Sequence, residues 1–254
     1  MALHDPSPWM FVLLLGAAVW AGAQNALAGG GSFITLPALI LSGMDPRAAN
    51  ITSTVALFPG QVTTGWAGRK LASGAENLSL RAMVAISLVG GAIGALLLLV
   101  TPPRYFEALL PWLVLFATAA FAWGTFSRRP VAAQGLKPAQ ALALQFFIAI
   151  YGGYFGGGIG FLMLAVLSMA QLPVRASLAT KNVLASVMNG TAVVVFLFSG
   201  EVRWLQAATL AVGAVGGGLA GAWLLRRANE RFLRLAVIAI GVALTIGLFI
   251  RAYR

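Results

Sequence analysis

The chain has 254 residues, of which 60% are hydrophobic and only 9% are charged. An ordinary soluble domain carries about 25% charged residues, and this many apolar side chains cannot all be buried in a soluble core of this size. In lipid, helices satisfy their own backbone hydrogen bonds. The composition therefore excludes an ordinary soluble domain and predicts an all-α, polytopic membrane protein.

The net charge of +11 raises nucleic acid as a partner. However, the 17 Lys and Arg residues lie almost entirely between apolar runs, without the interleaved aromatic residues of a nucleic-acid patch. We therefore expect them to flank spans in a lipid bilayer, and we expect no nucleic-acid partner. The chain has no cysteine, which excludes disulfides, thiolate metal sites and cysteine nucleophiles. Residues 1–8 contain no Lys or Arg, which favours a retained first segment over a cleaved signal peptide.

Ten apolar runs follow one another, at about 9–28, 32–43, 47–68, 82–100, 105–126, 139–155, 160–171, 176–199, 205–225 and 232–250. A helix that crosses the hydrocarbon needs about 20 residues. The runs at 32–43 and 160–171 are shorter and directly follow glycine triplets, so we expect half-helices that return from a segment broken at glycine. The polar stretch 127–138 divides the runs five and five. We predict a first transmembrane repeat (1–126), a cytoplasmic linker (127–138) and a second repeat (139–254).

The two glycine triplets belong to a longer internal similarity. At an offset of 128 residues, nine positions between 29 and 55 are identical. They are Gly29/Gly157, Gly30/Gly158, Phe33/Phe161, Leu36/Leu164, Leu39/Leu167, Arg47/Arg175, Ala48/Ala176, Thr52/Thr180 and Val55/Val183. We interpret this as a duplication, since self-similarity at one fixed offset is the signature of a repeat.

Positive charge predicts the orientation of the spans. If the linkers 69–81, 127–138 and 226–234 are cytoplasmic, together with the 172–175 turn and the start of the helix after it as far as Lys181, that side carries 12 Lys and Arg residues and the other side carries 5. The first repeat then begins outside and the second begins inside, with both termini extracytoplasmic. The prediction is a multi-pass protein of the cell inner membrane with two inverted-topology repeats, an architecture common among secondary transporters.

The spans contain no carboxylate, because all six acidic residues lie in or beside loops. Proton and cation carriers usually keep Asp or Glu at membrane depth, so the cation interpretation is weakened, although backbone carbonyls also bind cations. The spans do contain amides, hydroxyls and one ammonium, which suit an oxyanion. The 128-residue offset pairs Ser53 with Lys181 and Gln61 with Asn189. The side chains expected to bind substrate are Asn25, Thr52, Ser53, Thr180, Lys181, Asn182 and Asn189.

The half-helices add a second source of donors. A helix N-terminus presents unpaired N–H groups and a partial positive charge, and glycine lets the backbone approach a ligand closely. We expect these N–H groups to come from Gly29, Gly30, Gly31, Gly156, Gly157 and Gly158. Lys181 has an alternative role, because it lies about six residues past Arg175 and could snorkel to the cytoplasmic face as a topology signal.

These motifs resemble those of the sulfite exporter TauE/SafE family. The first-repeat signature is Gly29-Gly30-Gly31-Ser32-Phe33 with Leu36-Pro37, then Arg47-Ala48 and Thr52-Ser53. The second is Gly156-Gly157-Gly158, then Pro173-Val174-Arg175-Ala176 with Thr180-Lys181, and Ala165 stands where the first repeat has Pro37. The resemblance runs from about residue 9 to 250. It implies a bacterial permease for sulfite and related organosulfur anions, with Thr52, Ser53, Thr180 and Lys181 lining a broken-helix site.

Together these features predict a secondary exporter of a small sulfur oxyanion such as sulfite or an organosulfonate. It would work by alternating access with the anion held between half-helix N-termini at the bilayer midplane. No catalytic constellation or phosphate-binding loop is present, so neither an enzyme nor a cofactor is expected. Two alternatives stay open: a cation or metal-ion permease, and a non-transporting accessory subunit of a membrane complex. The chain is also compatible with a homodimer.

Overall fold

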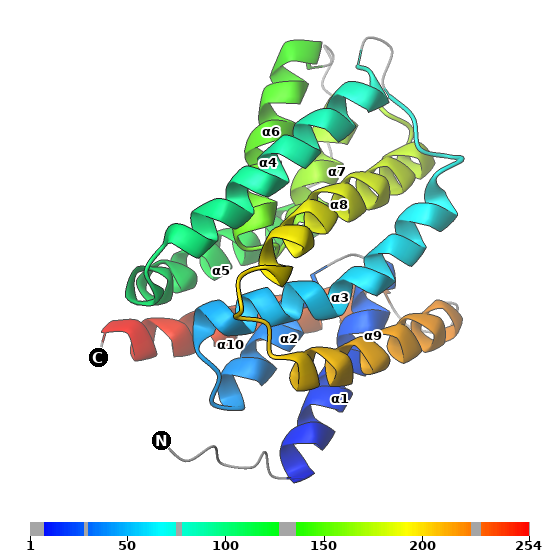
Figure 1. Ribbon diagram of the computed structural model, residues 1–254. Helices are drawn as coiled ribbons and strands as arrows, with labels where there is room; N and C mark the ends of the chain where they lie inside the picture. The colour runs from blue at the N-terminus through cyan, green and yellow to red at the C-terminus, as the bar shows by residue number, and fades with distance from the viewer. Residues whose placement is uncertain (1–7, 28–29, 75–77, 127–135, 225–229, 254) are drawn as a thin grey trace.

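The computed structural model describes residues 8–27, 30–74, 78–126, 136–224 and 230–253, and over these residues it contains helices and no strand. The helices are α1 (Pro8–Leu27), α2 (Ser32–Leu41), α3 (Pro46–Gly68), α4 (Leu80–Val100), α5 (Pro103–Phe126), α6 (Pro138–Tyr154), α7 (Ile159–Met169), α8 (Val174–Leu197), α9 (Trp204–Leu224) and α10 (Glu230–Tyr253) (Figure 1). Each predicted apolar run corresponds to one helix, so the all-α prediction is confirmed. Most of the linker 127–138 lies outside the described residues, and the division into two repeats stays a prediction.

Local sequence accounts for where helices begin. The Asp45 carboxylate accepts hydrogen bonds from the backbone N–H groups of Arg47 (2.9 Å) and Ala48 (3.2 Å), which caps the N-terminus of α3. Pro46 occupies the first turn of that helix, where its missing N–H costs nothing. Pro138 has the same position in α6, which places that helix start at the last residue of the predicted linker.

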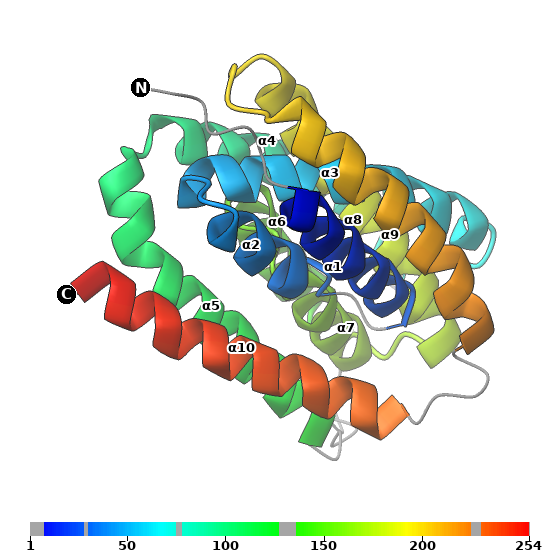
Figure 2. The same ribbon diagram turned by 90° about the horizontal axis from the view of Figure 1, so that it is seen from below.

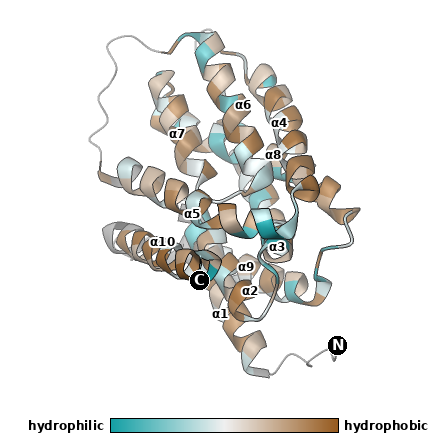
Figure 3. Ribbon diagram, turned by 90° about the vertical axis from the view of Figure 1, so that its left-hand side faces the viewer, coloured by the Kyte–Doolittle hydropathy of each residue, from teal (hydrophilic) through white to brown (hydrophobic). Residues whose placement is uncertain are grey.

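Among the described residues, four helical segments are long and apolar enough to span a membrane: Leu80–Val100, Pro103–Trp123, Val174–Leu197 and Leu235–Tyr253. Hydrophobic residues cover most of α4 and α10, as Figure 3 shows. The segments Ser32–Leu41 and Ile159–Met169 are apolar but too short to cross the hydrocarbon as helices. These helices support a multi-pass membrane protein.

Helices from the two ends of the chain pack against one another. The most extensive contacts join α1 with α9, α4 with α6, α3 with α8, and α4 with α8, and α5 also packs against α10. The pairs α5–α10 and α1–α9 are visible in Figure 2. The backbones of α1 and α9 meet where Gly217 faces the Val19 carbonyl oxygen, and those of α4 and α6 meet where Gly94 faces the Ile150 carbonyl oxygen. Glycine permits such approaches because it has no Cβ atom.

The short helices α2 and α7 lie in the interior of this arrangement. Most of the α2 side chains are buried, among them Phe33, Leu36 and Leu39. In α7 the buried side chains include Met163 and Leu167. The first turns of both helices are buried, at Phe33 and Ile34 in α2 and at Ile159 and Gly160 in α7, so their N-terminal ends lie inside the protein.

Candidate functional site

A cavity of about 180 Å³ lies between α1, α2, α3, α7, α8 and α9. It is smaller than the pockets of roughly 300–1,000 Å³ that hold drug-sized ligands, so it suits a small ligand. Its polar lining comes from Asn25, Ser32, Gln61, Thr63, Thr64, Lys181 and Asn182. Leu57, Ile159, Ala185, Ala214 and Val215 supply the apolar part, and the glycines at 22, 30, 60, 156, 160 and 218 bring backbone to the surface.

The N-terminal ends of both short helices reach the cavity. Gly30 and Ser32 contribute from the start of α2, and Ile159 and Gly160 from the start of α7. Gly30 (φ +88°) and Gly158 (φ +74°) have left-handed backbone conformations that L side chains rarely adopt. These glycines turn the chain into each helix, and the first N–H groups of a helix have no partner within it. The cavity therefore receives the positive ends of two helix dipoles.

Lys181 supplies the positive side chain at the cavity. It lies on the second turn of α8, is 5% exposed, and lines the cavity beside Asn182. No carboxylate of the described chain forms an ion pair with it. Its burial at the cavity distinguishes it from Arg175, which is exposed at the start of the same helix. A buried ammonium without a carboxylate partner is stabilised when an anionic ligand binds beside it.

Asn25 joins the cavity to the start of α2. Its Oδ1 accepts a hydrogen bond from the Gly31 N–H (2.8 Å). A Cβ atom at Gly31 would lie 2.6 Å from the Asn25 Nδ2, so the close contact requires glycine there. Asn25 therefore fixes the end of α1 against the beginning of α2, with its side chain at the cavity wall.

The threonine hydroxyls of α3 that line the cavity are engaged with their own helix. Thr63 Oγ1 donates to the Pro59 carbonyl oxygen (2.9 Å), and Thr64 Oγ1 donates to that of Gln61 (2.9 Å). Their protons are thus used on the backbone. The amide groups, the Lys181 ammonium, the Ser32 hydroxyl and backbone N–H groups are left as the donors for a ligand.

The structure places the other expected side chains away from the cavity lining. Thr180 Oγ1 donates to the Ser73 carbonyl oxygen (2.9 Å) and accepts from the Ser73 N–H (3.0 Å). Thr52 Oγ1 accepts from the Arg203 N–H (3.2 Å). Thr52 and Thr180, which lie 128 residues apart, thus each hold the loop after the other long helix: Thr180 holds the loop after α3, and Thr52 holds the loop after α8.

Ser53 and Asn189 are used within the protein. Ser53 Oγ lies 2.6 Å from Thr35 Oγ1 and links α3 to α2. Asn189 Nδ2 donates to Gln61 Oε1 (2.7 Å). Asn189 therefore contacts a residue that lines the cavity but does not line it itself. Among the glycines, Gly30 and Gly156 line the cavity, while Gly31, Gly157 and Gly158 lie beside it in the same turns. Gly29 lies outside the described residues.

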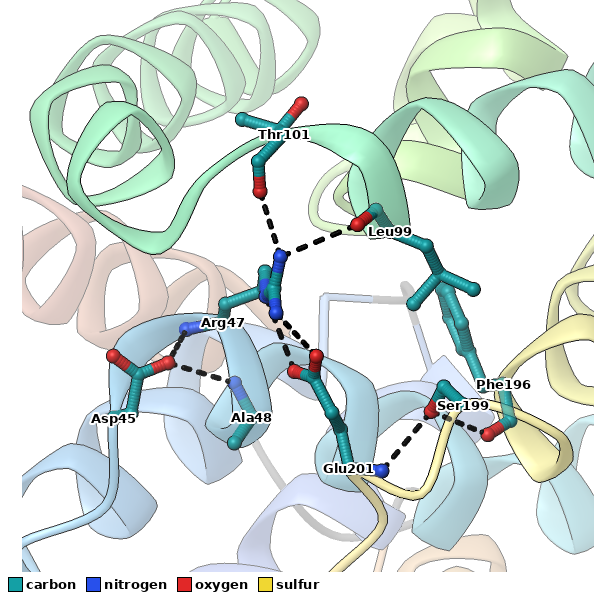
Figure 4. Close-up of polar contacts among 8 residues, drawn as sticks. All are labelled: Asp45, Arg47, Ala48, Leu99, Thr101, Phe196, Ser199 and Glu201. Atoms are coloured by element: carbon teal, nitrogen blue, oxygen red, sulfur yellow. Dashed lines mark hydrogen bonds and ion pairs between the residues drawn. The ribbon is translucent and has the colours of Figure 1, made fainter.

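An ion pair between Arg47 and Glu201 lies at the N-terminal end of α3, as Figure 4 shows. Arg47 forms two hydrogen bonds with the Glu201 carboxylate of the α8–α9 loop, one of them from Nε at 3.1 Å. Arg47 Nη1 also donates to the carbonyl oxygens of Thr101 (2.7 Å) and Leu99 (3.3 Å), at the end of α4. Fourteen residues of helix separate Arg47 from Gln61, which is about 21 Å at 1.5 Å per residue. The Arg47–Glu201 ion pair and the cavity therefore lie at different positions along α3.

The family model for the sulfite exporter TauE/SafE matches residues 14–248. The chain belongs to the TauE/SafE family. It is 28% identical to the probable membrane transporter protein ORF9 of a Sinorhizobium species, over 97% of this chain and 95% of that protein. It is 24% identical to the probable membrane transporter protein YfcA of Escherichia coli K12, over 96% and 91% respectively. A probable membrane transporter protein of Haemophilus influenzae is 26% identical over 87% of each chain. No solved structure matches.

Proposed function

We propose that this membrane transporter exports a small sulfur oxyanion, such as sulfite or an organosulfonate, as a secondary carrier. The observation that carries the proposal is the buried ammonium of Lys181 at a cavity that two helix N-termini also reach. The described lining of that cavity includes no carboxylate. An anion entering it gains charge-assisted hydrogen bonds and meets no acidic side chain.

The helix packing favours an inverted repeat as the frame of this site. If α1–α5 and α6–α10 are related by a two-fold operation, the contact of α1 with α9 becomes that of α6 with α4. The pairs α3–α8 and α5–α10 map onto themselves. The interactions of Thr52 and Thr180 with opposite loops follow the same exchange. Transporters of this architecture bind substrate where the repeats meet.

Alternating access gives the Arg47–Glu201 ion pair a role. With the predicted orientation, this pair lies at the extracytoplasmic end, and the cavity lies toward the cytoplasmic half of α3 and α8. The conformation described is then closed outside, and the pair must separate for the anion to leave. The membrane potential assists export, since an anion leaving a negative-inside cell gains about 2.3 kcal/mol per charge per 100 mV.

The test is flux of radiolabelled sulfite in proteoliposomes, with sulfate, sulfoacetate and taurine as competitors. We expect saturable sulfite flux that Lys181→Met reduces at least tenfold, since it removes a charged donor. Lys70→Met is the matched control, because Lys70 is exposed and away from the cavity lining. If folded wild-type protein carries none of these anions, the proposal is wrong, and a cation permease or an accessory subunit takes its place. If Lys181→Met and Lys70→Met behave alike, Lys181 does not bind substrate.

A further inference from the structure

Two amides of the cavity wall have their oxygen atoms occupied by the protein itself. Asn25 Oδ1 accepts from the Gly31 N–H at 2.8 Å, and Gln61 Oε1 accepts from Asn189 Nδ2 at 2.7 Å. No described residue accepts a hydrogen bond from Asn25 Nδ2 or Gln61 Nε2. The two amides thus retain N–H groups for the cavity that they line, while their acceptor atoms are turned toward protein donors.

The Gln61–Asn189 contact differs from an ordinary side-chain hydrogen bond in its position. The two residues are separated by the 128-residue offset of the internal similarity, and they join α3 to α8 where these helices pack. Asn189 is 2% exposed, and its own Oδ1 has no hydrogen-bond partner in the described part of the chain. A buried acceptor without a partner is costly. A purely structural polar contact would not require it, since an apolar pair would pack there without that cost.

The consequence is that Asn25 and Gln61 present donors, and not acceptors, to the cavity. A glutamine that is free to rotate about its last bond can offer either an acceptor oxygen or donor N–H groups. Asn189 holds Gln61 in one of these two states, because its Nδ2 occupies the acceptor. A cation at the cavity would then meet N–H groups of Gln61 and Asn25 as well as the Lys181 ammonium, whereas an anion would meet donors from each.

We propose that Gln61 contacts the transported anion through Nε2 and that Asn189 is the positioning residue that selects this orientation. The inference rests on the proposed function and deepens it, since it assigns the anion selectivity of the same cavity to a buried amide pair. Asn189 acts through Gln61, because it does not itself line the cavity.

The variants that test this are Asn189→Asp, Asn189→Leu and Gln61→Leu. Aspartate has no N–H group, so in Asn189→Asp the carboxylate accepts from Gln61 Nε2 and turns the Gln61 oxygen toward the cavity. Leucine removes the donor and leaves Gln61 free to rotate. Thr191→Val is the matched control on α8, because the Thr191 hydroxyl bonds only the carbonyl oxygen of Val187 on its own helix (3.0 Å) and does not line the cavity.

The measurement is the KM and maximal rate of radiolabelled sulfite flux in proteoliposomes, with protein content and thermal stability measured for each variant. A lost hydrogen bond to a charged group corresponds to about a tenfold to a hundredfold loss of affinity. We expect Gln61→Leu and Asn189→Asp to raise the KM by such a factor, with a smaller rise for Asn189→Leu and none for Thr191→Val. If Asn189→Asp does not fold, Asn189→Leu and Gln61→Leu carry the comparison.

The double variant Gln61→Leu/Asn189→Leu, which adds no charge beside the cavity, separates positioning from a merely structural role. Its KM should equal that of Gln61→Leu alone, since Asn189 has nothing left to orient, whereas independent effects would add. Saturable wild-type flux with an unchanged KM in the Asn189 and Gln61 variants would overturn the inference and leave the transport proposal intact. Absence of flux from folded wild-type protein would overturn both.

Discussion

The contact between α1 and α9 leads to a sharp prediction, because neighbouring glycines of α9 differ completely in their surroundings. A Cβ atom added at Gly217 would overlap the backbone of Val19 on α1, including its carbonyl oxygen. A Cβ atom added at Gly216 would meet nothing within 4 Å. The comparison of Gly217→Ala with Gly216→Ala therefore isolates the closeness of the two helices.

The expected difference follows from two terms. Replacing glycine by alanine inside a helix favours the helix by about 1 kcal/mol, and this gain is common to both variants. Overpacking a well-packed contact costs about 1–3 kcal/mol, and only Gly217→Ala incurs that cost because the obstructing atoms are backbone. Gly217→Ala should thus be less stable than Gly216→Ala by about 1–3 kcal/mol, or roughly 2–12 °C in Tm.

The assay is thermal unfolding in detergent, followed by the fluorescence of the seven tryptophans. Both variants should be purified and measured beside the wild type in one detergent, so that the protein–detergent reference is shared. Gly216→Ala should match or exceed the wild type. Equal Tm values for Gly216→Ala and Gly217→Ala would refute the close approach of α1 and α9.

Three further predictions concern contacts elsewhere in the fold. Gly94→Ala should lose a similar 1–3 kcal/mol relative to Gly16→Ala, since only the Cβ at Gly94 would meet the Ile150 carbonyl oxygen; equal Tm values would count against the α4–α6 contact. Thr180→Val should cost about 1–2 kcal/mol through its two bonds to Ser73, with no change in the KM for sulfite; a raised KM would return Thr180 to the substrate site. Glu201→Gln should cost about 1 kcal/mol in low salt, and the loss should shrink at 1 M salt, because the pair with Arg47 is only partly buried. Glu107→Gln, at the more exposed pair with Arg251, is the control, and an equal loss in both variants would contradict a special role for Arg47.

The helices were predictable because their ends carry local signals. Glycine turns precede α2 and α7, and prolines stand at the first turns of α3 and α6. That α2 and α7 are short was also predictable, since their apolar runs are shorter than the about 20 residues that cross the hydrocarbon as a helix. Signals of this kind depend on neighbours in sequence, which a single chain displays directly.

The cavity was only partly predictable, because it depends on contacts between distant residues. Asn25, Lys181 and Asn182 line the cavity, together with Gly30 and Gly156, and their role in substrate binding stays a prediction. Thr52 and Thr180 drew attention because they are identical residues at the 128-residue offset, yet each bonds a loop. Sequence could not separate these roles, because a hydroxyl that binds backbone N–H groups and one that binds an oxyanion are the same group. Gln61 was visible only as the partner of Asn189 under the offset, and its place at the cavity depends on how α3 and α8 pack.

The crossed packing of the helices also constrains how the protein is made. The partner of α1 is α9, and about 180 residues separate the two in the chain. At a synthesis rate of roughly 5–20 residues per second, α1 exists for about 10–40 s before its partner emerges from the ribosome. Until α9 is inserted, lipid, the insertion machinery or the helices made before α9 contact the α1 surface that will later pack against α9. Final assembly must therefore wait until α9 has been inserted. A chain truncated before α9 would leave α1 without its main partner.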